Sequence, residues 1–111
     1  MALGVETALI QGTWKGQIEI PGSPLEVIVY LKQASTGEWT GTIDIPAQNS
    51  KDLPLTEMLI KDEEISFVIK GIPGKPTFKG KFVPNESSIQ GQFTQGGMDF
   101  HFKLTKPSDT Q

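Results

Sequence analysis

The sequence predicts an all-β fold, a single eight-stranded antiparallel up-and-down barrel, on three observations. A five-residue pattern of apolar, any, Gly, any and apolar residues recurs at residues 14–18, 39–43, 78–82 and 89–93. Eight short runs alternate apolar with polar side chains, as strands with one buried face do. Short turns join each run to the next, which leaves no segment for a domain-sized helix.

The first half of the chain supplies four strands after an N-terminal segment, residues 1–11, where a short helical turn is expected. The first strand covers about residues 13–20 and ends at a turn with two prolines, which cannot donate to a sheet ladder. The second covers residues 25–33 and the third residues 39–45. In the fourth, residues 53–60, the apolar positions change parity, which predicts a bulge near Thr56 and Glu57.

The second half supplies strands at residues 65–70, 77–83, 88–94 and 98–105, so that the barrel domain covers residues 12–105. The polar residues 106–111 are expected to form a flexible tail. An open meander would expose two edges, whereas pairing the eighth strand with the first removes both. The repeated glycines favour closure, because strongly coiled strands need residues without Cβ at their bends. A two-sheet sandwich is the alternative.

Composition disfavours several functional classes. The net charge is −3, and all ten basic residues are Lys, so that no Arg is present to clamp phosphates or nucleic acid. The absence of Cys removes thiol chemistry and thiolate metal sites. No signal-like leader and no membrane-spanning run is recognisable, so we expect a cytoplasmic protein without a membrane span.

Candidate catalytic residues are few. His101 is the only histidine, and alternation directs it toward solvent. Asp44, Asp52 and Glu57 have the positions of turn and edge carboxylates, and no cluster of His, Cys and acidic residues with metal-ligand spacing occurs. The sequence therefore predicts no catalytic residue, no metal and no cofactor, and a protein that is not an enzyme.

The inward side chains leave two interpretations of the interior open. Either they fill the barrel as a solid core, or the repeated glycines leave a cavity for a small apolar ligand. The predicted ligand-lining residues are Trp14, Gly16, Ile18, Val27, Val29, Trp39, Gly41, Ile43, Phe67, Phe78, Gly80, Gly91, Phe93, Phe100 and Phe102.

Three apolar side chains are predicted to face outward. Ile28 and Tyr30 share one face of the second strand, and Val68 has the outward parity of the fifth. Such a group forms a candidate partner surface, for a homodimer or for a docking domain.

Gly12-Thr13-Trp14 at the start of the first strand resembles the Gly-x-Trp signature of the calycins, the lipocalin and fatty-acid-binding-protein group. With Asp44-Ile45-Pro46 and the hairpin Thr94-Gln95-Gly96-Gly97, residues 12–104 resemble the small lipocalin-like barrel domain found in bacteria N-terminal to an α/β-hydrolase. The resemblance implies a barrel with an accessory or binding role. In that family the chemistry belongs to the hydrolase domain, and this chain has no Gly-x-Ser-x-Gly elbow.

We therefore expect a non-catalytic, lipocalin-like binding or accessory module for a small apolar ligand or a hydrolase partner domain. Two alternatives stay open. One is a structural or oligomerisation module with a filled core and no ligand. The other is the N-terminal fragment of a longer hydrolase.

Overall fold

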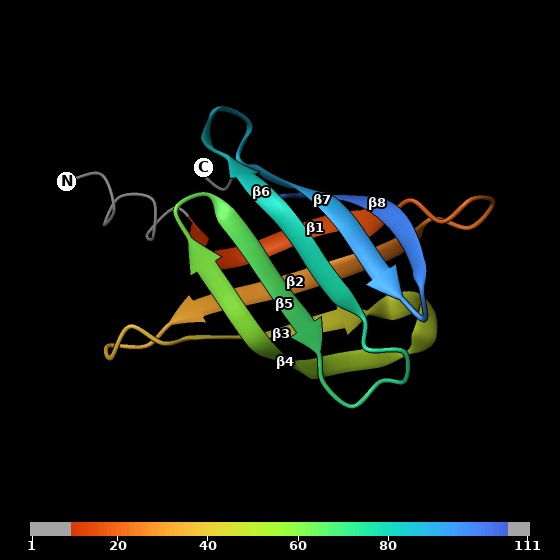
Figure 1. The fold of residues 1–111 in the computed structure, drawn as a ribbon, viewed down its shortest axis with the longest axis horizontal. Helices are drawn as coiled ribbons and strands as arrows, with labels where there is room; N and C mark the ends of the chain where they lie inside the picture. Colours follow the sequence, from red (N-terminus) through yellow and green to blue (C-terminus); the bar gives the residue numbers. More distant parts are fainter. Residues whose placement is uncertain (1–9, 107–111) are drawn as a thin grey trace.

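The computed structural model describes residues 10–106, and over that range it confirms the predicted closed barrel of eight strands (Figure 1). The strands are β1 (Gly12–Ile18), β2 (Leu25–Gln33), β3 (Trp39–Ile45), β4 (Ser50–Lys61), β5 (Glu64–Ile69), β6 (Thr77–Val83), β7 (Ser88–Gln95) and β8 (Met98–Thr105). Two short 3-10 helices, η1 (Pro46–Gln48) and η2 (Pro84–Glu86), join β3 to β4 and β6 to β7. The helical turn predicted at residues 1–11 falls mostly on residues 1–9, which lie outside the described residues.

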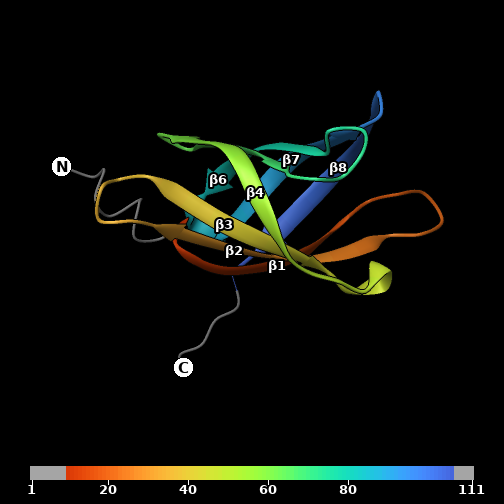
Figure 2. The ribbon, with the colours of Figure 1, turned by 90° about the horizontal axis from the view of Figure 1, so that it is seen from below.

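The barrel is flattened into two crossing layers. β1, β2 and β3 form one layer, β5, β6 and β7 lie across the other, and β4 bends from the first layer into the second (Figures 1 and 2). Closure comes from β1 and β8, which pair from Lys15 opposite Thr105 to Ile18 opposite Phe102. Because this pairing joins the ends of the meander, the alternative of two separate sheets is wrong.

β4 contains the predicted irregularity. Its register with β5 shifts between Thr56 and Leu59, and Glu57 within the shift has a φ of 52°. The extra residue restores the inward direction of the apolar side chains after the parity change. Four half-buried side chains around the shift therefore pack against the core, namely Leu53, Leu55, Met58 and Ile60.

The repeated glycines lie where neighbouring strands approach closely. A Cβ atom built on Gly16 would lie 1.9 Å from the backbone oxygen of Lys103 on β8. One built on Gly91 would lie 2.0 Å from the backbone oxygen of Lys79 on β6. At Gly41 and Gly80 the nearest backbone oxygens would be 2.5 and 2.6 Å away. All four distances are too short for any residue with a Cβ. The glycines therefore allow neighbouring strands to come into contact, and they do not leave a cavity inside the barrel.

Aromatic rings occupy the middle of the barrel. The ring centroid of Phe78 lies 5.0 Å from that of Phe67, 4.8 Å from that of Phe93 and 5.0 Å from that of Phe102. The rings are tilted or edge-on, the arrangements that aromatic pairs prefer. Since these four residues come from β5, β6, β7 and β8, the cluster links the whole second half of the chain.

Candidate functional site

The interior residues predicted to line a cavity pack against one another. Nine of them belong to the buried core: Trp14, Ile18, Val27, Val29, Ile43, Phe67, Phe78, Phe93 and Phe102. Trp14 is fully enclosed, and its Nε1 donates a hydrogen bond of 2.8 Å to the backbone oxygen of Ile10. Trp39 and Phe100 are half-buried and pack on the same core. The predicted residues therefore do meet inside the barrel, but they pack against one another and do not surround a cavity.

The enclosed space at one end of the barrel is small. A cavity of about 40 Å³ lies there, bordered by Ile18, Ile45, Ile69 and Phe93 among others. Small-molecule sites measure about 300–1,000 Å³, whereas 40 Å³ is room for about one water molecule. The geometry favours the filled-core interpretation over a ligand held inside the barrel.

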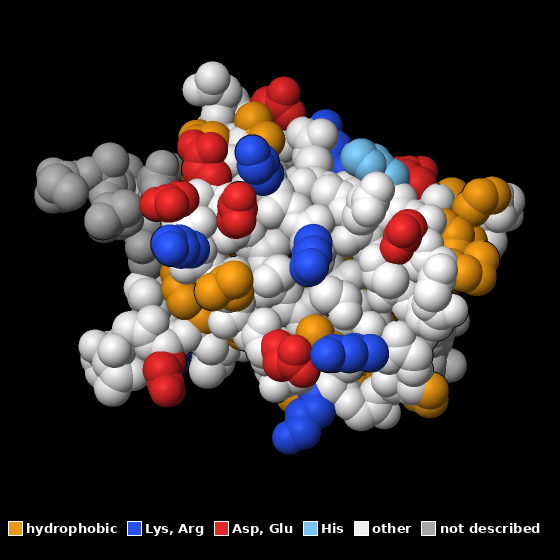
Figure 3. Space-filling view, in the orientation of Figure 1, with side chains coloured by type: hydrophobic (Ala, Val, Ile, Leu, Met, Phe, Trp, Pro, Cys, Tyr) orange, Lys and Arg blue, Asp and Glu red, His pale blue; other side chains and the backbone are white. Residues whose placement is uncertain are grey.

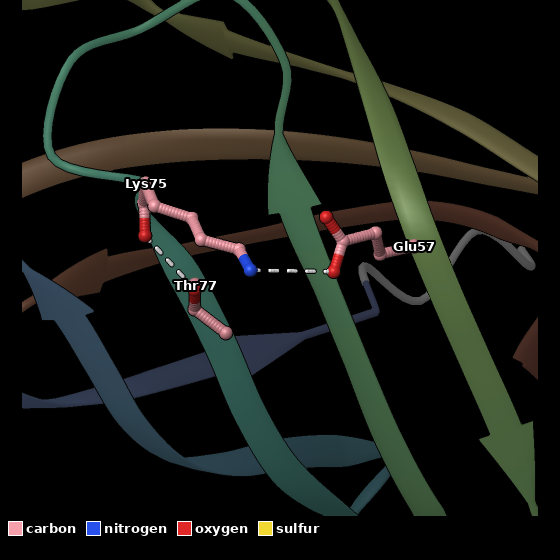
Figure 4. Close-up of polar contacts among 3 residues, drawn as sticks. All are labelled: Glu57, Lys75 and Thr77. Carbon is pink, nitrogen blue, oxygen red and sulfur yellow. Dashed lines mark hydrogen bonds and ion pairs between the residues drawn. The ribbon is translucent and has the colours of Figure 1, made fainter.

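The predicted partner surface of Ile28, Tyr30 and Val68 is wrong for Val68. This side chain has the outward parity that was expected, but it is only 7% exposed. Glu57 on β4 and Lys75 in the loop before β6 form an ion pair of 3.6 Å across the outer face of β5 (Figure 4). Val68 lies on β5 between Thr56 of β4 and Thr77 of β6, and because it is buried it contributes nothing to a patch with Ile28 and Tyr30.

Tyr30 and Asp44 form a polar pair on the outer face of β2 and β3. The Tyr30 hydroxyl donates a hydrogen bond of 3.0 Å to Oδ2 of Asp44, and the backbone N–H of Asp52 donates one of 2.8 Å to Oδ1. Asp44 therefore ties three strands together, and its two oxygens are engaged in structural bonds. The hydrogen bond to Asp44 raises the pKa of Tyr30, with smaller contributions from burial and from the charges of Asp44 and Asp52.

We expect the absorbance of tyrosinate in the folded protein to appear with a midpoint above pH 10, the ordinary pKa being about 10. Tyr30 is the only tyrosine, so the titration reports this residue alone. Because folding raises its pKa, the stability that Tyr30 contributes is complete below about pH 10 and is lost as pH rises through the folded-state pKa. Asp44→Asn should return the midpoint toward 10. A midpoint at or below 10 in the unmodified protein would contradict the pairing.

An opening in the barrel wall separates β3 from β4. Their pairing extends to Thr42 opposite Pro54, whereas β3 begins at Trp39 and β4 continues to Lys61. Beyond this pair the two strands diverge, β3 staying in one layer and β4 bending into the other (Figures 1 and 2). The opening has a volume of about 500 Å³ and is lined by residues 37–39 and 55–60.

Core side chains reach the surface at this opening. Four half-buried side chains line it, namely Trp39, Leu55, Met58 and Ile60. Leu59 points outward beside them and is 58% exposed. Figure 3 shows hydrophobic side chains at the surface over the end of β4, between charged ones. Leu59 and these four side chains line the same opening, and contiguous exposed apolar surface is a common mark of a binding site.

Sequence reasoning did not single out Met58, Leu59 or Ile60 as site residues. The signal that could have found them is the parity change at Thr56 and Glu57, because a bulge bends its strand away from a neighbour. A bend of this kind in β4 leaves the beginning of β3 unpaired on its β4 side, and the residues on either side of that gap line the opening.

A second concavity of about 510 Å³ lies on the outer face over β5, β6 and β7. Its floor includes Gly80 and Gly91, and its rim carries Glu64 together with Lys79 and Lys81. The charges on this rim have both signs, and the strands beneath it are paired on both sides. Leu59 and the core residue Ile65 also line this concavity, but the paired strands beneath it offer no unpaired backbone groups, so the β3–β4 opening is the stronger candidate.

His101 is exposed on β8, opposite Gln92 of β7. Over residues 10–106, no three or more His, Asp or Glu side chains are grouped so that they could hold a metal ion. In the same range, no helix is long and apolar enough to cross a membrane.

No family model matches the chain, and comparisons with curated proteins and with solved structures find no match. The closed barrel is consistent with the lipocalin-like resemblance, and membership of that family stays a prediction.

Proposed function

We propose that the chain is a non-catalytic binding or accessory module that docks a protein partner on its outer wall. The observation that carries the proposal is the contrast between the two candidate sites. The interior is filled by side chains around a cavity of about 40 Å³, whereas the β3–β4 opening measures about 500 Å³ and exposes core residues. A hydrolase domain, which the lipocalin-like resemblance suggests, is one such partner.

The apolar surface at the opening supports docking in a second way. Leu59 is more than half exposed, although a leucine side chain gains about 1.5–3 kcal/mol from full burial. Met58 and Ile60 lie beside it in the sequence and are only half-buried. A partner that covers these side chains would recover part of this burial energy, and the aromatic ring of Trp39 supplies the kind of anchor that interfaces favour.

A photo-crosslinking residue placed at Leu59 is expected to yield a protein adduct of one defined mass in cells that naturally make this chain. The same residue placed at Gln92, which is exposed on β7, is the matched control and should yield none. Both positions are exposed on strands, so neither change disturbs the core. Adducts that are absent at Leu59, or equally abundant at both positions, would contradict docking at the opening.

A further inference from the structure

The two strands that border the opening each have a backbone edge without a partner strand. Ala34 N–H donates to the backbone oxygen of Glu38, so these residues bond across β2 and β3. Since backbone groups alternate in direction along a strand, the N–H and C=O of Trp39 point away from β2, toward the opening. No strand within residues 10–106 pairs with Trp39 on that side.

The opposite border has the same property. Phe82 N–H donates to the backbone oxygen of Glu63, which places the bonds between β5 and β6 at Glu63 and at alternate residues after it. Glu64 and Ser66 therefore bond toward β4, to Lys61 and Leu59. By alternation, the backbone groups of Met58 and Ile60 point the other way, into the opening. Over the described part of the chain, no strand pairs with them there.

The bulge in β4 borders this gap. Glu57, in the bulge, is joined to Lys75 at 3.6 Å, on the side of β5 and β6 (Figure 4). A bulge bends its strand, and at this bulge, where Glu57 has a positive φ, β4 turns away from β3. The opening therefore results from the way the strands pair in the folded barrel, and no rearrangement is needed to form it.

The chemistry of the opening matches an extended peptide. Unpaired backbone donors and acceptors recur at strand spacing on both borders, and an added strand satisfies such groups with its own backbone. Trp39, Met58 and Ile60 supply apolar surface for every second side chain of that strand. Two charged residues line the opening, Glu38 and Glu57. Glu57 is paired with Lys75, so Glu38 is the carboxylate that basic side chains of the occupant would complement.

Resting on the docking function proposed above, we infer that the β3–β4 opening binds an extended segment of its partner, with alternating apolar and basic residues, as an additional β-strand. Backbone pairing supplies the affinity, the apolar positions fix the register, and Glu38 selects Lys or Arg at the outward position beside it. The occupant is a peptide segment and not a folded surface, because only an extended backbone can reach both edges.

Fluorescence anisotropy with a labelled peptide of about seven residues, a common strand length, tests this inference directly. The probe alternates Val and Lys. A peptide that alternates Val and Glu is the charge control, and a Val–Lys peptide N-methylated at every second residue is the backbone control. We expect the probe to bind at least about tenfold more tightly than either control. The Val–Glu peptide would be repelled by the acidic side chain of Glu38, and the N-methylated peptide has lost backbone hydrogen-bond donors.

Two charge-reversed variants locate the binding. Glu38→Lys should weaken binding of the Val–Lys probe by about fivefold, whereas Glu26→Lys, an equally exposed change farther along β2, should leave it unchanged. Equal affinity for probe and N-methylated peptide, or equal effects of the two variants, would overturn the inference. So would sedimentation showing a dimer of this chain that excludes the probe. If crosslinking at Leu59 succeeds while every peptide fails to bind, docking stands and the strand-addition inference falls.

Discussion

Gly16→Ala is expected to lower the free energy of unfolding by about 3 kcal/mol, the upper range for an overpacked site. The added Cβ would lie 1.9 Å from the backbone oxygen of Lys103 and 2.7 Å from the Cα of Leu104. Neither atom belongs to a flexible side chain, so relief requires β1 and β8 to separate. These two strands close the barrel over only a few paired residues. Against a total stability of about 5–15 kcal/mol for a domain, such a loss is large.

Urea unfolding of a graded series measures this effect. Lys15→Ala changes an exposed neighbour on β1 and should alter stability by no more than about 0.5 kcal/mol. Gly41→Ala should cause a loss of stability between those of the other two variants. Its added Cβ would lie 2.5 Å from the nearest backbone atom, and its other close neighbours are the side chains of Leu31 and Leu55. If Gly16→Ala were as stable as Lys15→Ala, strand contact would not be the reason for the glycine.

The strands themselves could be predicted because the information is local. Alternation over residues 14–18 and its repeats places Trp14 and Ile18 inside, and the turn residues between runs set the antiparallel order. The role of the glycines could not be decided in the same way. Gly16 could leave a cavity or permit contact between strands, depending on which residue lies opposite it. That residue belongs to β8 beside Lys103, far along the chain, so the local sequence cannot decide.

The candidate site illustrates the same limit. Alternation correctly directed Val68 outward, but the side chain is buried between the neighbouring strands, where it lies opposite Thr56 of β4 and Thr77 of β6. Packing by residues of two neighbouring strands leaves no trace in the sequence pattern around Val68. The bulge at Glu57 was predictable from the change of parity, whereas the opening also depends on where the pairing of β3 and β4 stops, which is a property of the closed barrel.

Phe78→Ala is expected to lower the free energy of unfolding by about 3–5 kcal/mol, since it removes a fully buried ring and leaves a cavity. The ring contacts those of Phe67, Phe93 and Phe102, so three aromatic pairs are lost together. Phe100→Ala is the matched control on β8. Its ring is only half-buried, and its removal should cost distinctly less.

The same variant tests whether the unmodified barrel is filled. A dry apolar cavity made by removing a ring can bind benzene, and the bound ligand then raises the stability of the folded state. We therefore expect saturating benzene to raise the melting temperature of Phe78→Ala, and to leave the unmodified protein and Phe100→Ala unchanged. A cavity of about 40 Å³ at the barrel end is too small to admit the ring. An equal rise in the melting temperature of the unmodified protein would show that the interior already contains a ligand-sized cavity. Binding of a small apolar ligand inside the barrel would then be favoured over docking at the β3–β4 opening.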